Sequence, residues 1–133
     1  MLRAASYLGA SNLQILVVDD TQDTRDVMRT MLELWGHQVI EAVNGKDAVQ
    51  VALDSMPDVI IMDLRMPVMD GVEATRVLRQ YQQFKNVPII AMSAHCAGKW
   101  KQEALEAGCN DCVSKPFDPE KLNGLLTRFA QVA

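Results

Sequence analysis

Short apolar runs alternate five times with helical patterns along this chain, and no other feature constrains its fold as strongly. Residues 15–18 and 59–62 are unbroken runs of Val, Ile, Leu and Met, which is typical of strands buried on both faces of a parallel sheet. The pattern therefore predicts an α/β fold in which a parallel sheet lies between layers of helices. The predicted strands are residues 15–19, 38–42, 59–62, 88–92 and 111–114.

Helix signals fill the intervals between these strands. Apolar residues at helical spacing extend from Val27 to Trp35, and Gly36 can end that helix. Asn44 can cap a second helix that runs to about residue 53, and Asp118 can cap the last one. The other two helices are predicted over residues 71–80 and 99–107.

Length and composition indicate one domain of 133 residues. No apolar stretch approaches the ~20 residues of a membrane span, and residues 1–12 lack the apolar core of a signal peptide, so we expect a cytoplasmic protein. The net charge is −4 and the basic residues are scattered, which argues against direct binding to DNA.

Three cysteines, Cys96, Cys109 and Cys112, make a disulfide framework improbable in a chain without a secretory signal, and we expect reduced thiols. Cys109 and Cys112 form a C-x-x-C motif, but its only nearby companions for a zinc site are His95 and Cys96. Redox or metal chemistry at this motif is therefore the weaker alternative.

Acidic residues end two of the predicted strands. Asp19 and Asp20 follow the first apolar run, and Asp63 follows the third strand. Ligands of open α/β sheets bind at the carboxyl ends of the strands, so neighbouring strands would bring these carboxylates together there. Two unit charges about 4 Å apart repel by roughly 4 kcal/mol at an effective dielectric of about 20, so the cluster requires a cation.

The fourth and fifth strands deliver Ser93 and Lys115 to the same edge. Hard carboxylate oxygens suit Mg²⁺, while a hydroxyl and an ammonium group are suited to phosphoryl oxygens. Each residue also has an ordinary interpretation, because acids after strands often lie in solvated loops and a serine can satisfy backbone groups.

Four stretches together resemble the receiver domain of two-component response regulators: ILVVDD at 15–20, MDLRMPVMDG at 62–71, PIIAMSA at 88–94 and KPF at 115–117. The resemblance covers residues 12–129. It implies an N-terminal tail over 1–12 and a receiver domain over 13–130. The implied fold is flavodoxin-like, a five-stranded parallel sheet of order 2-1-3-4-5 between five helices.

The resemblance also assigns roles to individual residues. Asp63 would be the phosphoacceptor, receiving the phosphoryl group from a phosphohistidine. Asp20 would bind Mg²⁺ directly and Asp19 largely through water, with Asp63 and the backbone carbonyl of Arg65 completing the protein ligands. Lys115 would pair with phosphate oxygens.

Ser93 would hydrogen-bond the same phosphate, and the Lys115–Pro116 peptide would be cis. The implied partners are a histidine kinase or histidine phosphotransfer protein and a downstream protein target. The motifs look most like those of receivers in hybrid histidine kinases or phosphorelays, which would be phosphoacceptors and not turnover enzymes.

Two residues depart from the pattern. Receivers usually carry Tyr or Phe three residues before the lysine, and here that position is Cys112, so the usual rotation of a ring is missing or replaced. We expect phosphorylation to shift the surface near the fourth and fifth strands less than in relatives with the ring. Trp100 is either a partly buried cap on the core or an exposed anchor for a partner.

Two rival functions fit the sequence less well. A phosphohydrolase with an aspartyl nucleophile would need an acid two residues after Asp63, and that place is Arg65. A flavin or nucleotide binder would need a glycine-rich loop after the first strand, where Asp19 and Asp20 would repel a phosphate.

Overall fold

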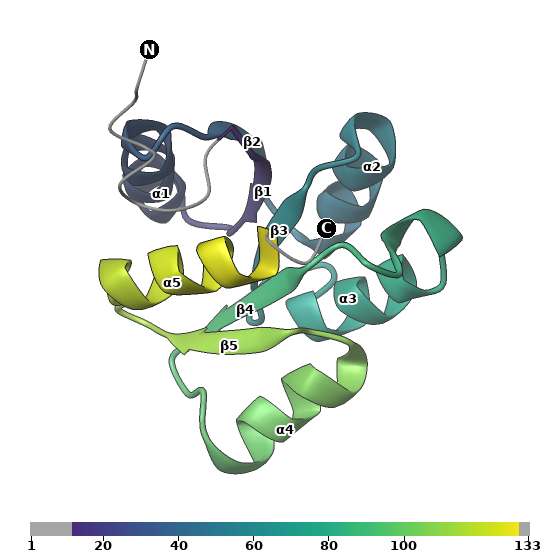
Figure 1. The fold of residues 1–133 in the computed structure, drawn as a ribbon. Coiled ribbons are helices and arrows are strands. Elements are labelled where there is room, and N and C mark those ends of the chain that lie inside the picture. The colour runs from purple at the N-terminus through teal and green to yellow at the C-terminus, as the bar shows by residue number, and fades with distance from the viewer. Residues whose placement is uncertain (1–11, 131–133) are drawn as a thin grey trace.

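The fold is a five-stranded parallel sheet covered by helices on both faces (Figure 1). The computed structural model describes residues 12–130, so the predicted tail over 1–12 lies outside the described residues except for Asn12. The strand order β2-β1-β3-β4-β5 confirms the predicted fold. The strands are β1 (Gln14–Val18), β2 (Gln38–Ala42), β3 (Val59–Asp63), β4 (Ile89–Ser93) and β5 (Asp111–Ser114).

The helices form two groups, one on each face of the sheet. One face packs against α1 and α5, and the other against α2, α3 and α4 (Figure 1). Their bounds are α1 (Gln22–Leu34), α2 (Gly45–Ser55), α3 (Gly71–Arg79), α4 (Gly98–Ala107) and α5 (Pro119–Ala130), with a short 3₁₀ helix η2 (Gln82–Phe84) before β4. No helix among the described residues is both long and apolar enough to cross a bilayer.

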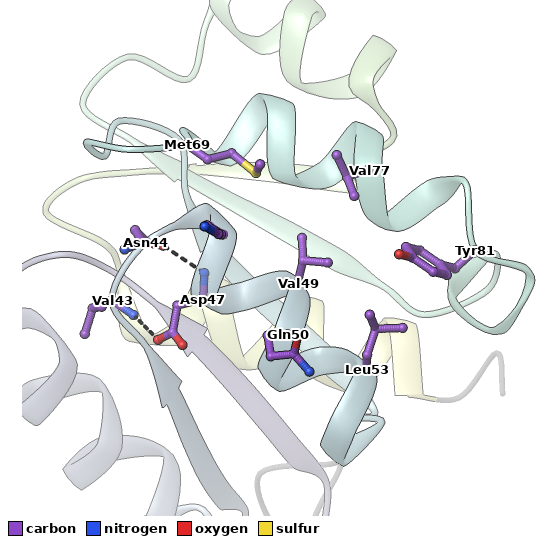
Figure 2. A pocket seen from close by; sticks show the side chains of 10 residues that line it. Val43, Asn44, Asp47, Val49, Gln50, Leu53, Met69, Val77 and Tyr81 are labelled. Atoms are coloured by element: carbon purple, nitrogen blue, oxygen red, sulfur yellow. Dashed lines mark hydrogen bonds between the residues drawn. The ribbon is translucent and has the colours of Figure 1, made fainter.

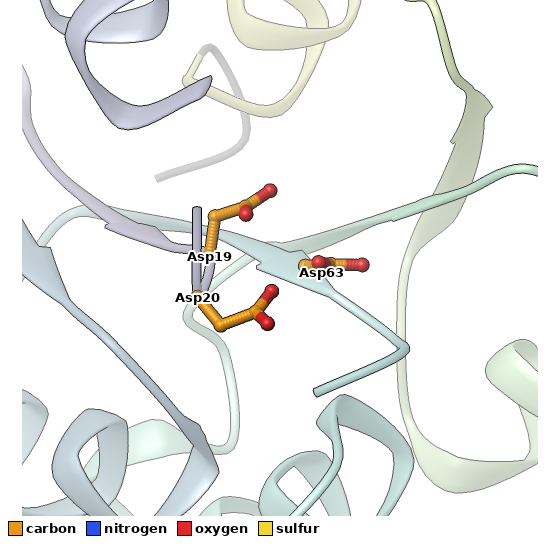
Figure 3. Close-up of side chains that lie close together, drawn as sticks. All are labelled: Asp19, Asp20 and Asp63. Carbon is orange, nitrogen blue, oxygen red and sulfur yellow. The ribbon is translucent and has the colours of Figure 1, made fainter. Parts of the chain in front are cut away.

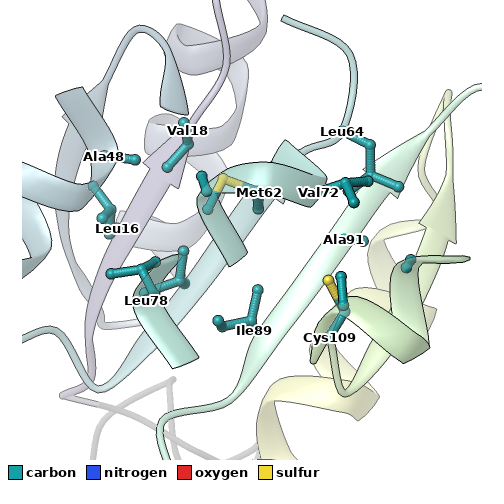
Figure 4. Close-up of a cluster of buried hydrophobic side chains, with 14 of the residues drawn as sticks. Leu16, Val18, Ala48, Met62, Leu64, Val72, Leu78, Ile89, Ala91 and Cys109 are labelled. Carbon is teal, nitrogen blue, oxygen red and sulfur yellow. The ribbon is translucent and has the colours of Figure 1, made fainter. Parts of the chain in front are cut away.

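Residues of each central strand alternate between two hydrophobic cores. In β1, Leu16 and Val18 join the core under α2, α3 and α4 (Figure 4), whereas Ile15 and Val17 join the core under α1 and α5. All four side chains are fully buried. Because both faces of the strand need apolar residues, the sequence run is unbroken instead of alternating with polar positions.

Side-chain caps fix where the helices begin at the carboxyl edge of the sheet. The Asp47 amide donates to Asn44 Oδ1 at 2.8 Å, the Glu73 amide to Asp70 Oδ1 at 2.9 Å, and the Glu120 amide to an Asp118 carboxylate oxygen. The predicted caps at Asn44 and Asp118 are therefore present. Asp70 likewise caps α3.

One prediction about cysteine is wrong. Cys96 and Cys112 form a disulfide, and only Cys109 is a free, buried thiol within the described residues. The two bonded residues are 16 positions apart in sequence, but the pairing of β4 with β5 brings their Cα atoms to 5.7 Å. That separation lies within the range that a disulfide spans.

The first residue of α3 packs directly on the end of β3. A Cβ atom added to Gly71 would meet the carbonyl oxygen of Asp63 and would lie 2.8 Å from Met62 Cγ. Strand β3 ends at the acidic residue that the sequence singled out, so this close approach sets how α3 sits beside Asp63. Only glycine fits there without displacing the backbone.

We therefore expect Gly71→Ala to lower the free energy of unfolding by about 1–3 kcal/mol, as overpacking does elsewhere. Gly124→Ala is the matched control, because Gly124 lies in α5 with no atom within 4 Å of an added Cβ, and it should be neutral or slightly stabilising. Urea unfolding of both variants measures the difference. Equal stabilities of the two variants would contradict this packing argument.

Candidate phosphoacceptor and metal site

Three carboxylates meet at the carboxyl edge of the sheet, as predicted. Strands β1 and β3 are paired neighbours, and Val18 lies opposite Met62, so the acids that follow them end side by side. One oxygen from each of Asp19, Asp20 and Asp63 lies within 4.8 Å of the others (Figure 3). Asp19 and Asp63 are buried and Asp20 is exposed.

Lys115 supplies a cation among these charges. Its Nζ lies 3.1 Å from Asp19 Oδ2 and 3.1 Å from Asp63 Oδ2. The expected cis peptide between Lys115 and Pro116 is present. When all four groups are ionised, three carboxylates and one ammonium leave two negative charges, which a divalent cation would neutralise.

The backbone holds the remaining oxygens of the two buried carboxylates. The Thr21 amide donates to Asp19 Oδ1 at 2.8 Å, and the Arg65 amide donates to Asp63 Oδ1 at 3.1 Å. Among residues 12–130, by contrast, the Asp20 carboxylate has no hydrogen bond or ion pair. Asp20 thus offers an exposed carboxylate without a protein partner, which suits a metal ligand that also keeps water molecules.

Burial opposes ionisation of Asp63. Loss of solvent raises the pKa of this carboxyl group above its ordinary value, although the Arg65 amide and Lys115 pull the pKa in the opposite direction. Burial alone would lower the pKa of Lys115, but its hydrogen bonds and charge interactions with Asp63 and Asp19 raise it overall. The lysine therefore stays charged. Because burial makes the Asp63 carboxylate costly, a further cation beside it would be favourable.

Ser93 lies at the same edge, as its position at the end of β4 predicted. It is 5% exposed, and its Oγ accepts a hydrogen bond from the His95 amide at 3.2 Å. The strand pairing places Met92 opposite Asp63, and the Lys115 amide donates to the Ser93 carbonyl oxygen at 2.8 Å. The serine hydroxyl keeps its own proton available for donation to another group.

Arg25 is a positioning residue that the sequence did not reveal. Its guanidinium donates to the Asp19 carbonyl oxygen at 2.8 Å and to Glu41 Oε1 at 2.8 Å. Arg25 is 8% exposed, although it is charged. Its spacing could have indicated this role, because Arg25 lies three residues before Met28 on the buried face of α1. A charge on that face needs a partner, since an unpaired buried charge is costly.

Trp100 lies on the surface close to the site and does not cap the core. Its side chain is 40% exposed, and its ring contacts the Arg65 guanidinium, 5.1 Å from ring centroid to carbon, and the Lys99 ammonium at 5.7 Å. These are the distances of cation–π contacts. Arg65, predicted to provide a backbone ligand, thus directs its side chain away to a ring at the start of α4.

A surface groove lies between α2 and α3, apart from the acidic cluster (Figure 2). It is an open groove of about 650 Å³, lined by residues such as Val49, Leu53 and Tyr81. None of the acids of the cluster lines it. This groove is therefore separate from the acidic cluster at the sheet edge.

The site and fold can be compared with known proteins. The family of the response regulator receiver domain matches residues 15–127. An uncharacterised 14.6 kDa protein of Leptolyngbya boryana is 38% identical over 90% of this chain and 91% of its own length. The regulatory protein AtoC of Escherichia coli is also 38% identical over 90% of this chain, but this chain spans only 25% of AtoC.

A solved structure agrees with these sequence matches. The receiver domain of the sensor histidine kinase PA1611 of Pseudomonas aeruginosa, crystallised with a magnesium ion in its active-site cleft, has a TM-score of 0.84 and 36% identity. The match covers 91% of this chain and 99% of that one. The chain belongs to the response regulator receiver domain family, whose members are phosphoacceptors in two-component signalling and not conventional enzymes.

The geometry predicts competition between Lys115 and a divalent cation. The ammonium lies 3.1 Å from two of the three carboxylates, so Lys115→Met removes a like charge from the metal's neighbourhood. We expect the Kd for Mg²⁺ to fall by about tenfold, equivalent to ~1.4 kcal/mol. Isothermal titration calorimetry measures this Kd. Lys85→Met is the control, because Lys85 is an exposed lysine outside the cluster. Unchanged or weaker Mg²⁺ binding in Lys115→Met would contradict the competition.

Proposed function

We propose that Asp63 is the residue that accepts the phosphoryl group. The observation that carries this proposal is the convergence of three carboxylates and Lys115 on one edge of the sheet. Asp63 is the member that ends a central strand, is 3% exposed and shares its second oxygen with Lys115. A carboxylate oxygen of Asp63 would bond to phosphorus as the phosphorus–nitrogen bond of a phosphohistidine breaks, leaving the electron pair on the imidazole.

The acidic residues around it would hold Mg²⁺. Asp20 would bind the ion directly, Asp19 largely through water, and Asp63 together with the Arg65 backbone carbonyl would complete the protein ligands. Oxygen ligands of this kind and a cluster charge of two negative units fit a hard divalent ion. When bound, Mg²⁺ supplies charge neutralisation for an incoming phosphoryl group.

Lys115 and Ser93 would bind the phosphoryl oxygens. Lys115 already bridges Asp19 and Asp63, so a phosphoryl group on Asp63 would bring new anionic oxygens within reach of the same ammonium group. Ser93 Oγ now accepts from the His95 amide, and its free proton would be donated to a phosphoryl oxygen. Neither residue would have to cross the sheet, because both lie at its carboxyl edge.

Membership of the family implies a histidine kinase as the source of the phosphoryl group. We further propose that a histidine phosphotransfer protein can serve as the donor, that phosphorylation changes the binding of a downstream protein, and that the protein works in the cytoplasm. The receiver domain would comprise residues 13–130 after a tail over 1–12. A phosphohydrolase remains disfavoured, because Arg65 is an unsuitable proton donor and its guanidinium faces Trp100.

Incubation with acetyl phosphate and Mg²⁺ tests the proposal. We expect a single phosphoryl adduct in intact-protein mass spectra, labile to hydroxylamine as acyl phosphates are, and its loss in Asp63→Asn. Asp54→Asn is the matched control, because Asp54 is an exposed aspartate at the end of α2. An adduct that persists in Asp63→Asn, or multiple turnover of unrelated phosphoesters, would overturn the proposed function.

A further inference from the structure

The Cys96–Cys112 disulfide joins two segments that flank the proposed phosphate site. Cys96 lies in the loop between β4 and α4, three residues after Ser93, and Cys112 lies within β5, three residues before Lys115. The bond therefore links the segment carrying the serine to the segment carrying the lysine. No other covalent crosslink is present among the described residues.

Contacts around Ser93 show what the crosslink restrains. The Ser93 carbonyl oxygen accepts from the Lys115 amide at 2.8 Å and lies 4.0 Å from Cys96 Sγ. The Ser93 hydroxyl oxygen accepts a hydrogen bond from the His95 amide, which lies in the same loop as Cys96. Any movement of Ser93 and the loop that follows it toward a phosphoryl group must therefore carry Cys96 along or strain the crosslink to β5.

The two sulfur positions differ in access. Cys112 is 1% exposed and belongs to the core under α4, whereas Cys96 is half-buried at the edge of that core. Cys109, the third cysteine, is 6% exposed and its Sγ lies 3.7 Å from the Thr75 hydroxyl. Burial raises the pKa of the Cys109 thiol, which makes that thiol a poor nucleophile. Cys109 is therefore unsuited to the exchange chemistry that joins Cys96 and Cys112.

We propose that Cys96 and Cys112 form a reversible redox modification site that controls the loop between β4 and α4. In the disulfide form the crosslink holds this loop on β5, and in the dithiol form the loop moves more freely. The extension to signalling rests on the proposed function: oxidation weakens the response of α4 to phosphorylation of Asp63.

The chemistry balances as thiol–disulfide exchange with a small-molecule disulfide such as oxidised glutathione. The accessible Cys96 thiolate attacks that disulfide, forms a mixed disulfide and releases one small thiol. The Cys112 thiolate then attacks the Cys96 sulfur and releases the second. Two protein thiols lose two electrons, the small disulfide gains them, and the two thiol protons end on the released thiols.

Thiol counting on the whole chain tests the site without any phosphorylation. Equilibration with oxidised glutathione should remove two of the three titratable thiols under denaturing alkylation, and reduced glutathione should restore them. Cys109→Ser should keep this reversible loss, and Cys96→Ser should abolish it. Failure of the 96–112 disulfide to form, or a pairing that involves Cys109, would overturn the proposal.

Amide hydrogen exchange tests the restraint on the loop. Exchange of residues 94–98 should be at least several-fold faster in the dithiol form than in the disulfide form, and Cys96→Ser should exchange fast under both conditions. Equal protection in the two forms would overturn the restraint. Because Cys96 is not fully buried, the serine variant keeps the core intact, and Cys112→Ala provides a second, independent dithiol mimic.

Beryllofluoride with Mg²⁺, a phosphoryl mimic, tests the link to signalling. In the disulfide form, amide NMR shifts should stay near the carboxylates, and in the dithiol form they should extend into α4. Identical shift patterns in both forms would overturn this link. Absence of any beryllofluoride response in either form would instead refute the proposed function, and the thiol and exchange measurements would still decide the redox site.

Discussion

The repulsion among three carboxylates at the end of a parallel sheet is the constraint on which the site depends. Asp19 and Asp63 are held in place because β1 and β3 are paired neighbours, and neither can turn into solvent without leaving the sheet edge. Lys115 neutralises part of this charge from the end of β5. The excess negative charge that remains is what suits the site to a divalent cation.

The scaffold makes that arrangement rigid. The central strands bury both faces in two separate cores, so their ends cannot shift without disturbing packing on either side. Arg25 fixes the Asp19 backbone from α1, and Gly71 allows α3 to pack directly on the end of β3. The carboxylates are thus preorganised before any metal or phosphoryl group arrives, which is how electrostatic catalysis avoids reorganisation in the reacting state.

The side of the site formed by β4 and β5 differs from the carboxylate side, because a covalent bond holds it together. Receivers usually place an aromatic ring where this chain has Cys112, and here a crosslink to Cys96 occupies that position. A ring can rotate between two packed positions, whereas a disulfide ties the loop between β4 and α4 to β5. Through the proposed reversible Cys96–Cys112 pair, the connection between phosphorylation and α4 depends on the thiol state of the protein.

Much of the fold was predictable because local patterns and global topology agree. Unbroken apolar runs identified the buried strands, and Asn44 and Asp118 marked helix starts through hydrogen bonds that span only two or three residues. The disulfide was missed although the predicted strand order already placed β4 beside β5, because three cysteines in a chain without a secretory signal favoured reduced thiols. Arg25 was missed because its partner Glu41 lies on another element, and residue spacing does not show that contact.

A carboxyl ¹³C NMR titration of Asp63, with and without Mg²⁺, measures whether the three carboxylates form one charge cluster that a divalent cation relieves. We expect the pKa of Asp63 to lie above the ordinary aspartate value in the absence of metal, because burial disfavours the charged form. Added Mg²⁺ should then lower that pKa, because the cation stabilises the carboxylate. An ordinary pKa that does not respond to Mg²⁺ would contradict the claim that these carboxylates form one charge cluster requiring a divalent cation.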